Sequence, residues 1–264
     1  MASRTGWEHA TPLLPELDVL TFRGSSATLK RKDQRLDMKT RWVLGIDISL
    51  AHGAFVQLCD GKLHDCMYVT DKKAVADKDR HHENYLAASK IKDMQLRDFE
   101  RLVFWSEFIE IVMEALEPEY VGIEDFAYRA PQSAHQIGEI SGIVRLSAYS
   151  KGLKLRLHDP MTLKMFACHE ANLDAKTTRV MIEERWPEAK AAFSRYVSGK
   201  DERTLEDLCD AYALAKLVDL EIQLRAGTVR LDSLHEKEVQ VFNRCTKRYP
   251  ESLLAREWIQ KIDG

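Results

Sequence analysis

The sequence predicts an α/β domain with a mixed five-stranded sheet flanked by helices, and an extension at each end. Three short apolar runs that follow one another closely indicate an antiparallel meander. A long helical pattern then separates the meander from a fourth strand, and strand–helix units follow. This order of elements is typical of a mixed α/β sheet. A length of 264 residues suits one such domain with extensions.

The meander is predicted from residues 42–48, 54–59 and about 63–69. The first two segments are short apolar runs, which favours buried strands. Asp60 and Gly61 form a dipeptide that strongly favours a tight hairpin turn, so they connect the second strand to the third.

The elements after the meander follow from periodicity and from breaking residues. A helical repeat ends before Pro118, and an apolar strand ending at Glu124 follows it. Asp174 is a suitable cap for one of the later helices. The predicted helices are residues 96–116, 133–150, 161–169, 175–186 and 204–225, and the predicted strands are 120–124 and 153–157.

The remaining segments carry weaker signals and define the expected organisation. Residues 1–40 lack sustained periodicity and form an irregular extension, and residues 71–92 form a polar insertion within the main domain, residues 41–225. Residues 226–264 form a C-terminal extension. Further helices in it are suggested by its apolar residues, Val239, Phe242, Leu254 and Trp258.

Composition limits the cellular setting more than the function. The chain is 45% hydrophobic and 31% charged, with a net charge of −3, which gives no overall basic footprint for nucleic acid. Basic residues are nevertheless concentrated locally, seven against two acidic residues in 22–42 and six against three in 151–179, so these segments could follow a phosphate backbone or simply be solvated faces. Five cysteines without a C-x-x-C pair, and no signal-peptide or membrane-length apolar run, favour a reducing cytoplasm.

Two acidic residues stand at the ends of predicted buried strands. Asp47 ends the first strand and Glu124 ends the fourth, each after an apolar run. A carboxylate in such a place needs a partner or a cation, although a lone strand-end aspartate often bonds a turn instead. If the two strands are neighbours, the two carboxylates could bind one cation together.

Two further acidic residues, Asp207 and Asp210, lie three apart on one predicted helix. This spacing puts them on the same side of the helix, at the margin of its apolar face, so they should point towards the sheet edge. Thr204 and Asp207 could instead form a capping box, a structural role that does not account for Asp210.

Four converging carboxylates would repel one another by several kcal/mol unless cations neutralised them. Carboxylate oxygens select Mg²⁺ or Mn²⁺. A pair of such ions roughly 3.5–4 Å apart would activate a water and stabilise the leaving 3′ oxygen of a phosphodiester. Phosphodiester hydrolysis is therefore the reaction that this residue pattern favours.

The order and the residue patterns of these segments resemble those of the RuvC family of Holliday junction resolvases. The resemblance covers about residues 42–224 and is carried by Gly45-Ile46-Asp47, Ile123-Glu124-Asp125-Phe126, Ser133-Ala134 through Gly142, and Asp207-Leu208-Cys209-Asp210-Ala211-Tyr212-Ala213-Leu214. It implies a ribonuclease H-like fold and a Mg²⁺-dependent (or Mn²⁺-dependent) endonuclease with two ions per site. The implied catalytic and metal-binding residues are Asp47, Glu124, Asp207 and Asp210.

The same resemblance implies contacts with DNA and a working assembly. Lys164 and Lys176 match basic residues that engage DNA near the scissile phosphate, although a solvated helix lysine is the commoner role. Phe126 and Tyr128 lie where the family has an aromatic residue that inserts at the junction centre. The implied partner is a four-way junction, cleaved by a homodimer in a bacterial or phage-infected cell, with residues 133–150 as the expected interface.

Several alternatives stay open at this point. The segment around Asp47 also looks like the first phosphate loop of an actin-like ATPase or sugar kinase, but the chain has no D-x-G-G-type segment for the second loop. A DNA-binding scaffold is disfavoured because buried carboxylates without a function reduce stability. A related nuclease that acts on RNA–DNA hybrids or on branched replication intermediates in general is an alternative that the sequence does not exclude. A zinc site assembled from His81, His82, Cys168 and His169 has no supporting spacing.

Overall fold

The structure is a computed structural model that describes residues 40–50, 52–70, 82–84, 92–125, 134–197, 202–247 and 249–261. The expected N-terminal extension, except Thr40, and most of the expected insertion at 71–92 lie outside these ranges. Within them, no helix combines the length and the apolar character needed to cross a membrane.

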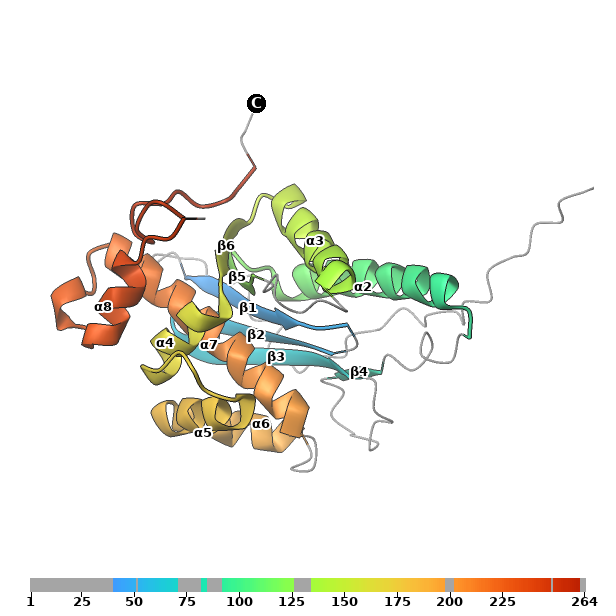
Figure 1. Ribbon diagram of the computed structural model, residues 1–264, viewed down its shortest axis with the longest axis horizontal. Helices are drawn as coiled ribbons and strands as arrows, with labels where there is room; N and C mark the ends of the chain where they lie inside the picture. The colour runs from blue at the N-terminus through green and yellow to red at the C-terminus, as the bar shows by residue number, and fades with distance from the viewer. Residues whose placement is uncertain are drawn as a thin grey trace, which may run out of the picture. The chain divides into compact units, whose positions relative to one another are not determined.

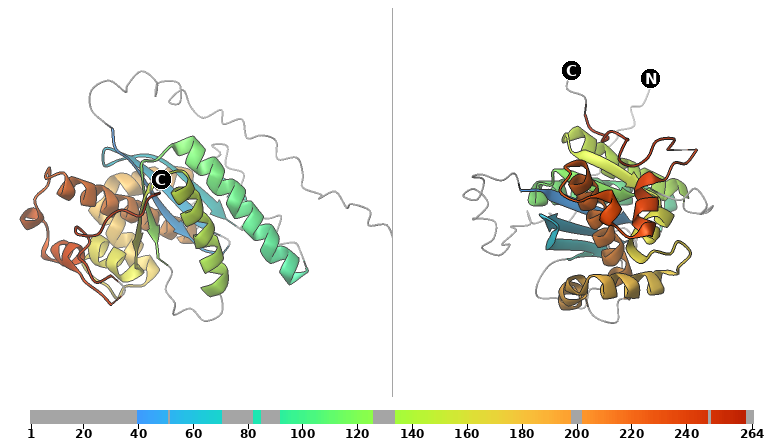
Figure 2. Two further views of the ribbon diagram at one scale, coloured as in Figure 1. Left: turned by 90° about the horizontal axis from the view of Figure 1, so that it is seen from above. Right: turned by 90° about the vertical axis from the view of Figure 1, so that its left-hand side faces the viewer.

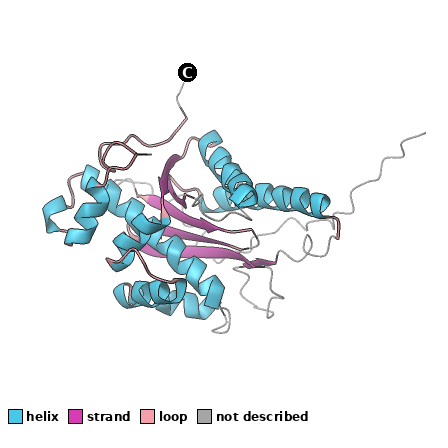
Figure 3. Ribbon diagram, in the orientation of Figure 1, coloured by secondary structure: helices cyan, strands magenta, loops and turns pink. Residues whose placement is uncertain are grey.

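A single mixed sheet forms the centre of the fold (Figure 3). Its strands are β1 (Trp42–Ile48), β2 (Gly53–Cys59), β3 (Lys62–Thr70), β4 (His82–Asn84), β5 (Tyr120–Glu124) and β6 (Lys154–His158). They lie in the order β4-β3-β2-β1-β5-β6. β1, β2 and β3 are the antiparallel meander, while β5 runs parallel to both β1 and β6. The predicted mixed sheet of five strands flanked by helices is confirmed, and β4 adds a short sixth strand at the edge.

The hairpin between β2 and β3 forms where the sequence predicted it. Asp60 and Gly61 both have positive φ, 48° and 76°. Two successive positive φ angles match the right-handed twist of the strands on either side, which is why this dipeptide suits the turn.

Helices cover both faces of the sheet (Figure 1). One face carries α2 (Met94–Leu116) and α3 (Ala134–Ser150), which pack side by side (Figure 2). The other carries α4 (Pro160–Cys168), α5 (Ala175–Arg185), α6 (Pro187–Tyr196) and α7 (Glu202–Arg225), followed by the 3₁₀ turn η2 (Leu231–Ser233) and α8 (Glu236–Asn243). Alternate residues of β1 therefore belong to two cores: Leu44 and Ile46 face α2 and α3, whereas Val43 faces α7.

Two glycines let α7 lie unusually close to the sheet. Gly45 of β1 and Gly122 of β5 are direct partners in the parallel register. A Cβ at Gly45 would lie 1.9 Å from the carbonyl oxygen of Ala211, and one at Gly122 would lie 2.8 Å from a methyl of Val218. Larger residues would push α7 away, so these positions require glycine.

The predicted helices are all present, with differences in detail. The first half of α2 departs from the expected core pattern: Leu96, Phe99 and Val103 are exposed, and the buried residues begin at Trp105. The helix α6 begins at Pro187 and was not predicted, because its proline reads as a break although proline is well suited to the first turn of a helix.

The C-terminal extension is helical only in part. α8 confirms a helix containing Val239 and Phe242, but Leu254 and Trp258 lie in irregular chain, so the expected helix there is wrong. Instead Ile259 pairs antiparallel with Leu155 of β6. The ring of Trp258 packs against two strand residues. Its centroid lies 4.4 Å from the guanidinium carbon of Arg156 on β6, and the ring makes an edge contact with Tyr120 on β5.

Candidate active site

The fold places Asp47 and Glu124 at neighbouring strand ends. β1 and β5 are adjacent and parallel, and Ile46 pairs with Ile123 in the register. Asp47 and Glu124 are the next residues along their strands, so both carboxylates emerge at the same edge of the sheet. The condition set by the sequence, that the two strands be neighbours, is met.

The helix α7 brings the second pair of acids to this edge. It starts at Glu202, two residues before Thr204, which is itself buried inside the helix. Thr204 is therefore not the N-cap, and the capping-box explanation for Asp207 fails. The charges of Asp207 and Asp210 both act on Glu124, which places α7 above the ends of β1 and β5.

Burial and mutual repulsion raise the pKa values of three of the acids. The pKa of Asp47 is raised to about 8, by burial first and then by the negative charge of Asp210. The pKa of Asp210 is raised to about 7, by burial and by Asp207. Burial, followed by Asp47 and Asp210, raises the pKa of Glu124 well above its usual value. Acids that shift one another in this way form a single electrostatic cluster, which a cation would stabilise.

Lys164 is the basic residue that acts most directly on this cluster. It lies half-buried on α4, and its Nζ donates a hydrogen bond of 2.6 Å to the carbonyl oxygen of Leu173. Its positive charge lowers the pKa values of both Glu124 and Asp210. Lys164 is therefore a fixed positive charge close enough to these two acids to stabilise their ionised forms.

Lys176 lies near Lys164 and is more exposed. It is in the first turn of α5, directly after the Asp174 cap, whose carboxylate accepts a bond of 2.7 Å from the Thr177 amide. Hydrogen bonds from Thr177 lower the pKa of Asp174, and both lysines add to that effect. The two predicted DNA-binding lysines thus lie within electrostatic reach of one carboxylate. The two predicted aromatics, Phe126 and Tyr128, fall outside the described residues.

The donor set and the charge of this site fit a hard divalent cation. Carboxylate oxygens are the preferred ligands of Mg²⁺ and Mn²⁺, and the mutual repulsion of the acids would be relieved by a positive ion. In the described parts of the chain, however, no three His, Cys, Asp or Glu side chains are close enough together to hold an ion. To hold an ion, these side chains would have to lie closer together than they do in this structure. The same finding gives no support to a zinc site at Cys168 and His169, and His169 instead stacks on His235 with ring centroids 3.7 Å apart.

Two charged residues of the site were missed by sequence reasoning. Arg203 lowers the pKa of Asp47, and Glu206 raises the pKa of Asp210. Both belong to α7, and the spacing of Arg203, Glu206 and Asp210, three and then four residues apart, is that of one helix face. This pattern could have identified them once the helix was recognised.

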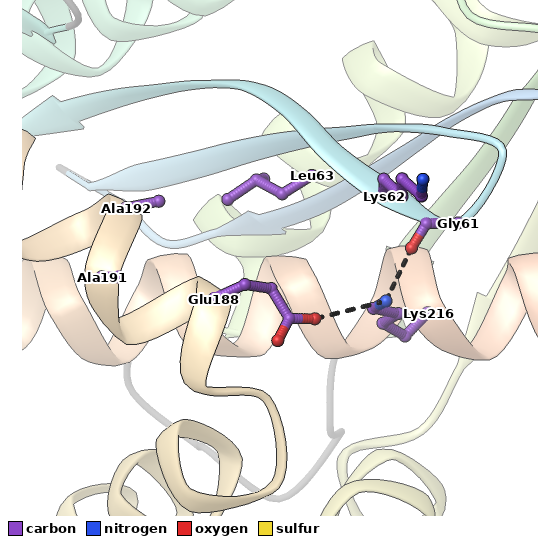
Figure 4. A pocket seen from close by; sticks show the side chains of 7 residues that line it. All are labelled: Gly61, Lys62, Leu63, Glu188, Ala191, Ala192 and Lys216. Atoms are coloured by element: carbon purple, nitrogen blue, oxygen red, sulfur yellow. Dashed lines mark hydrogen bonds and ion pairs between the residues drawn. The ribbon is translucent and has the colours of Figure 1, made fainter.

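A cavity lies away from these acids, between the β2–β3 hairpin, α6 and α7 (Figure 4). Its volume is about 490 Å³, and it is lined by Gly61, Lys62, Leu63, Glu188, Ala191, Ala192 and Lys216. The Nζ atom of Lys216 donates to the carbonyl oxygen of Gly61 at 2.6 Å and lies 3.7 Å from the Glu188 carboxylate. These polar groups satisfy one another, which indicates a structural role.

Comparison with known proteins yields one curated relative of note. The crossover junction endodeoxyribonuclease RuvC of Hydrogenovibrio crunogenus is 22% identical over 110 residues, which are 41% of this chain and 64% of the relative. The chain is similar to RuvC. The match spans a little less than two thirds of the relative's length. No family model matches the chain.

Solved structures of RuvC and of a yeast Holliday junction resolvase are also among the matches. Thermus thermophilus RuvC in complex with a Holliday junction substrate has a TM-score of 0.46 at 20% identity, covering 71% of this chain and 97% of the other. The yeast mitochondrial Holliday junction resolvase has a TM-score of 0.44 at 12% identity, covering 74% and 87%.

Proposed function

We propose that this chain is a Mg²⁺-dependent or Mn²⁺-dependent endonuclease that hydrolyses phosphodiester bonds of branched DNA and resolves four-way junctions by paired nicks. The observation that carries the proposal is the electrostatic cluster of Asp47, Glu124, Asp207 and Asp210 at the ends of two adjacent parallel strands. The similarity to RuvC, a crossover junction endodeoxyribonuclease, supports the choice of substrate.

In the proposed reaction, Asp47, Glu124, Asp207 and Asp210 hold two divalent cations. When bound, such ions lower the pKa of an attacking water and neutralise the charge that develops on the leaving 3′ oxygen. The chain itself contributes the arrangement of the carboxylates. The rigid strands β1 and β5 fix two of them, and α7 fixes the other two against the sheet.

Lys164 contributes a fixed positive charge beside the carboxylates. Its bond to the Leu173 carbonyl holds the ammonium group in place, and its remaining N–H donors are free to be aimed at a non-bridging phosphate oxygen. Lys176, more exposed on the neighbouring helix, would contact the DNA backbone further from the scissile bond. Phe126 and Tyr128 are the proposed contacts with bases at the junction centre.

Paired nicking requires two active sites, so we propose a homodimer. A two-fold dimer matches the symmetry of a four-way junction, and α3 is the proposed interface. Leu146 and Tyr149 of α3 are exposed apolar residues, which supports that choice. The five cysteines, all within the described ranges, form no disulfide bond, in keeping with the reducing cytoplasm of a bacterial or phage-infected cell.

The deciding experiment compares cleavage of a four-way junction, a flap, a linear duplex and an RNA–DNA hybrid in Mg²⁺. We expect symmetric paired nicks on the junction and little product from the linear duplex. Equal cleavage of the flap would reduce the proposal to a general branched-DNA nuclease, and preference for the hybrid would replace DNA by RNA–DNA as the substrate. Absence of metal-dependent cleavage on all four would refute the nuclease assignment.

A further inference from the structure

Asp125, the residue directly after Glu124, is bound by three different elements. Its side chain is only 2% exposed. One carboxylate oxygen accepts a hydrogen bond of 2.9 Å from Nη2 of Arg145 on α3, and the other accepts one of 2.9 Å from the hydroxyl of Tyr249. Its amide donates to the carbonyl oxygen of His158 on β6 at 2.7 Å. A buried carboxylate bonded on both oxygens is a fixed point in the structure.

Tyr249 belongs to the C-terminal segment, residues 244–247 and 249–261, which is anchored on β6 by independent contacts. Ile259 and Leu155 exchange backbone hydrogen bonds of 2.8 and 3.1 Å. Arg156 of β6, itself paired with the buried Glu221, donates bonds of 3.0 Å to two carbonyl oxygens of the segment. Because these contacts fix the segment on β6, they also restrict the position of the Tyr249 hydroxyl that bonds Asp125.

A second contact of the same segment is with the start of α4. Nη1 of Arg244 donates a bond of 3.0 Å to the hydroxyl of Thr162 and lies 3.7 Å from the carboxylate of Asp159. Asp159 is the N-cap of α4, the helix that carries Lys164. The C-terminal segment therefore contacts Asp125, the residue after Glu124, and also the first turn of α4, the helix that carries Lys164.

We propose that Tyr249 is a positioning residue for the active site, acting through Asp125 to fix the end of β5 that carries Glu124. Glu124 and Asp125 share a peptide bond, so rotation or displacement of Asp125 moves the Glu124 side chain with it. Placement errors of a fraction of an ångström matter for ligands that must converge on a cation. This inference rests on the proposed nuclease function for its catalytic consequence, but its structural core can be tested without it.

The test uses the full-length Tyr249→Phe variant, which removes the hydroxyl and keeps the ring that packs against Arg256. Hydrogen–deuterium exchange of the metal-free protein should show faster exchange at residues 123–125 than in wild type, because their anchor is lost. Junction cleavage should fall about tenfold, the expected effect of losing one hydrogen bond to a charged group. Junction binding without metal should stay within about twofold, since the hydroxyl donates to the buried carboxylate of Asp125.

Tyr120→Phe is the matched control. Tyr120 lies at the opposite end of the same strand, and its hydroxyl also bonds a charged side chain, the ammonium of Lys154 at 3.0 Å. This variant should leave exchange at residues 123–125 and junction cleavage unchanged. An Asp125→Asn variant provides the second arm. It also removes the charge that pairs with Arg145, so its own effects should be larger than those of Tyr249→Phe. Adding Tyr249→Phe to it should change either effect little, because the hydroxyl acts through the Asp125 carboxylate.

The outcomes separate the two claims. Faster exchange at 123–125 in Tyr249→Phe, absent in Tyr120→Phe, supports the positioning role even if no nucleic acid is cleaved by wild type. Unchanged exchange at 123–125 overturns it, whatever happens to cleavage. Equal loss of cleavage in Tyr249→Phe and Tyr120→Phe, or a lower junction affinity that accounts for the whole loss, also overturns it.

Discussion

Replacing Asp210 with asparagine should stabilise the metal-free protein at pH 8 although it removes a proposed catalytic residue. In the folded chain the Asp210 pKa is about 7, whereas the usual value is 3.8. At pH 8 the group is ionised in both the folded and the unfolded chain, and the charge is disfavoured only in the folded one. Removing that charge therefore raises the free energy of unfolding.

The magnitude follows from the displacement of the pKa. A change from 3.8 to about 7, at about 1.4 kcal/mol for each pKa unit, corresponds to about 4 kcal/mol. The buried asparagine amide still has to be desolvated, which costs about 1–2 kcal/mol. We therefore expect a net gain of about 2–3 kcal/mol, or an increase in Tm of about 5–10 °C for a domain of this size.

The assay is thermal unfolding in EDTA at pH 8, repeated with Mg²⁺ and accompanied by junction cleavage. Wild type should gain stability on adding Mg²⁺, whereas Asp210→Asn should gain little and should not cleave. Asp219→Asn is the control on the same helix: Asp219 is buried but lies 3.3 Å from Nε of Arg41, so its loss should destabilise. If Asp210→Asn has a lower Tm than wild type in EDTA, the proposed repulsion among the acids is wrong.

Three further predictions concern pH, the glycine contact and a buried ion pair. The free energy of unfolding of the metal-free protein, measured with urea, should fall by about 2 kcal/mol between pH 6.5 and 8. The pKa of Asp47 is raised to about 8 in the folded chain, so the folded chain loses the Asp47 proton in this range, whereas the unfolded chain has already lost it. A flat profile would contradict this. Gly45→Ala should abolish cleavage and cost about 3 kcal/mol or more, seen in the same assay, because its Cβ would lie 1.9 Å from the Ala211 carbonyl oxygen; wild-type stability would refute the close contact. Glu221→Gln should cost about 3 kcal/mol, since it leaves the charge of the buried Arg156 without its partner, whereas an unchanged urea midpoint would show that the pair is not essential.

Sequence periodicity predicted most of the elements, but it did not predict how far along each helix the apolar residues are buried. The repeat through Leu96, Phe99 and Val103 is as regular as the one that follows, yet only the second half of α2 packs on the sheet. Periodicity reports the face of a helix, and it carries no information on where along its length a neighbour lies. The same limit explains the C-terminal error, because Trp258 is held by ring contacts with residues far away in sequence.

The candidate site was predictable to the extent that its residues stand at element ends. Asp47 and Glu124 end apolar strands, so their unusual positions could be recognised locally. Asp207 could not be distinguished from a capping residue until the helix start was fixed at Glu202. The contribution of Tyr249 had no local signal at all, because its hydrogen bond to Asp125 joins residues 124 positions apart.

A stronger sequence signal for the site lies two residues before each strand-end acid. Gly45 precedes Asp47 and Gly122 precedes Glu124 by two positions, and two positions along a strand return to the same face. The sheet face that carries the two carboxylates therefore has glycines two residues earlier, and α7 lies against the backbone at these glycines. The same close packing of α7 on the two glycines therefore also brings its two acids towards Asp47 and Glu124. A glycine two residues before a carboxylate in two adjacent parallel strands, together with a helix carrying two acids, should locate such a site in other sequences.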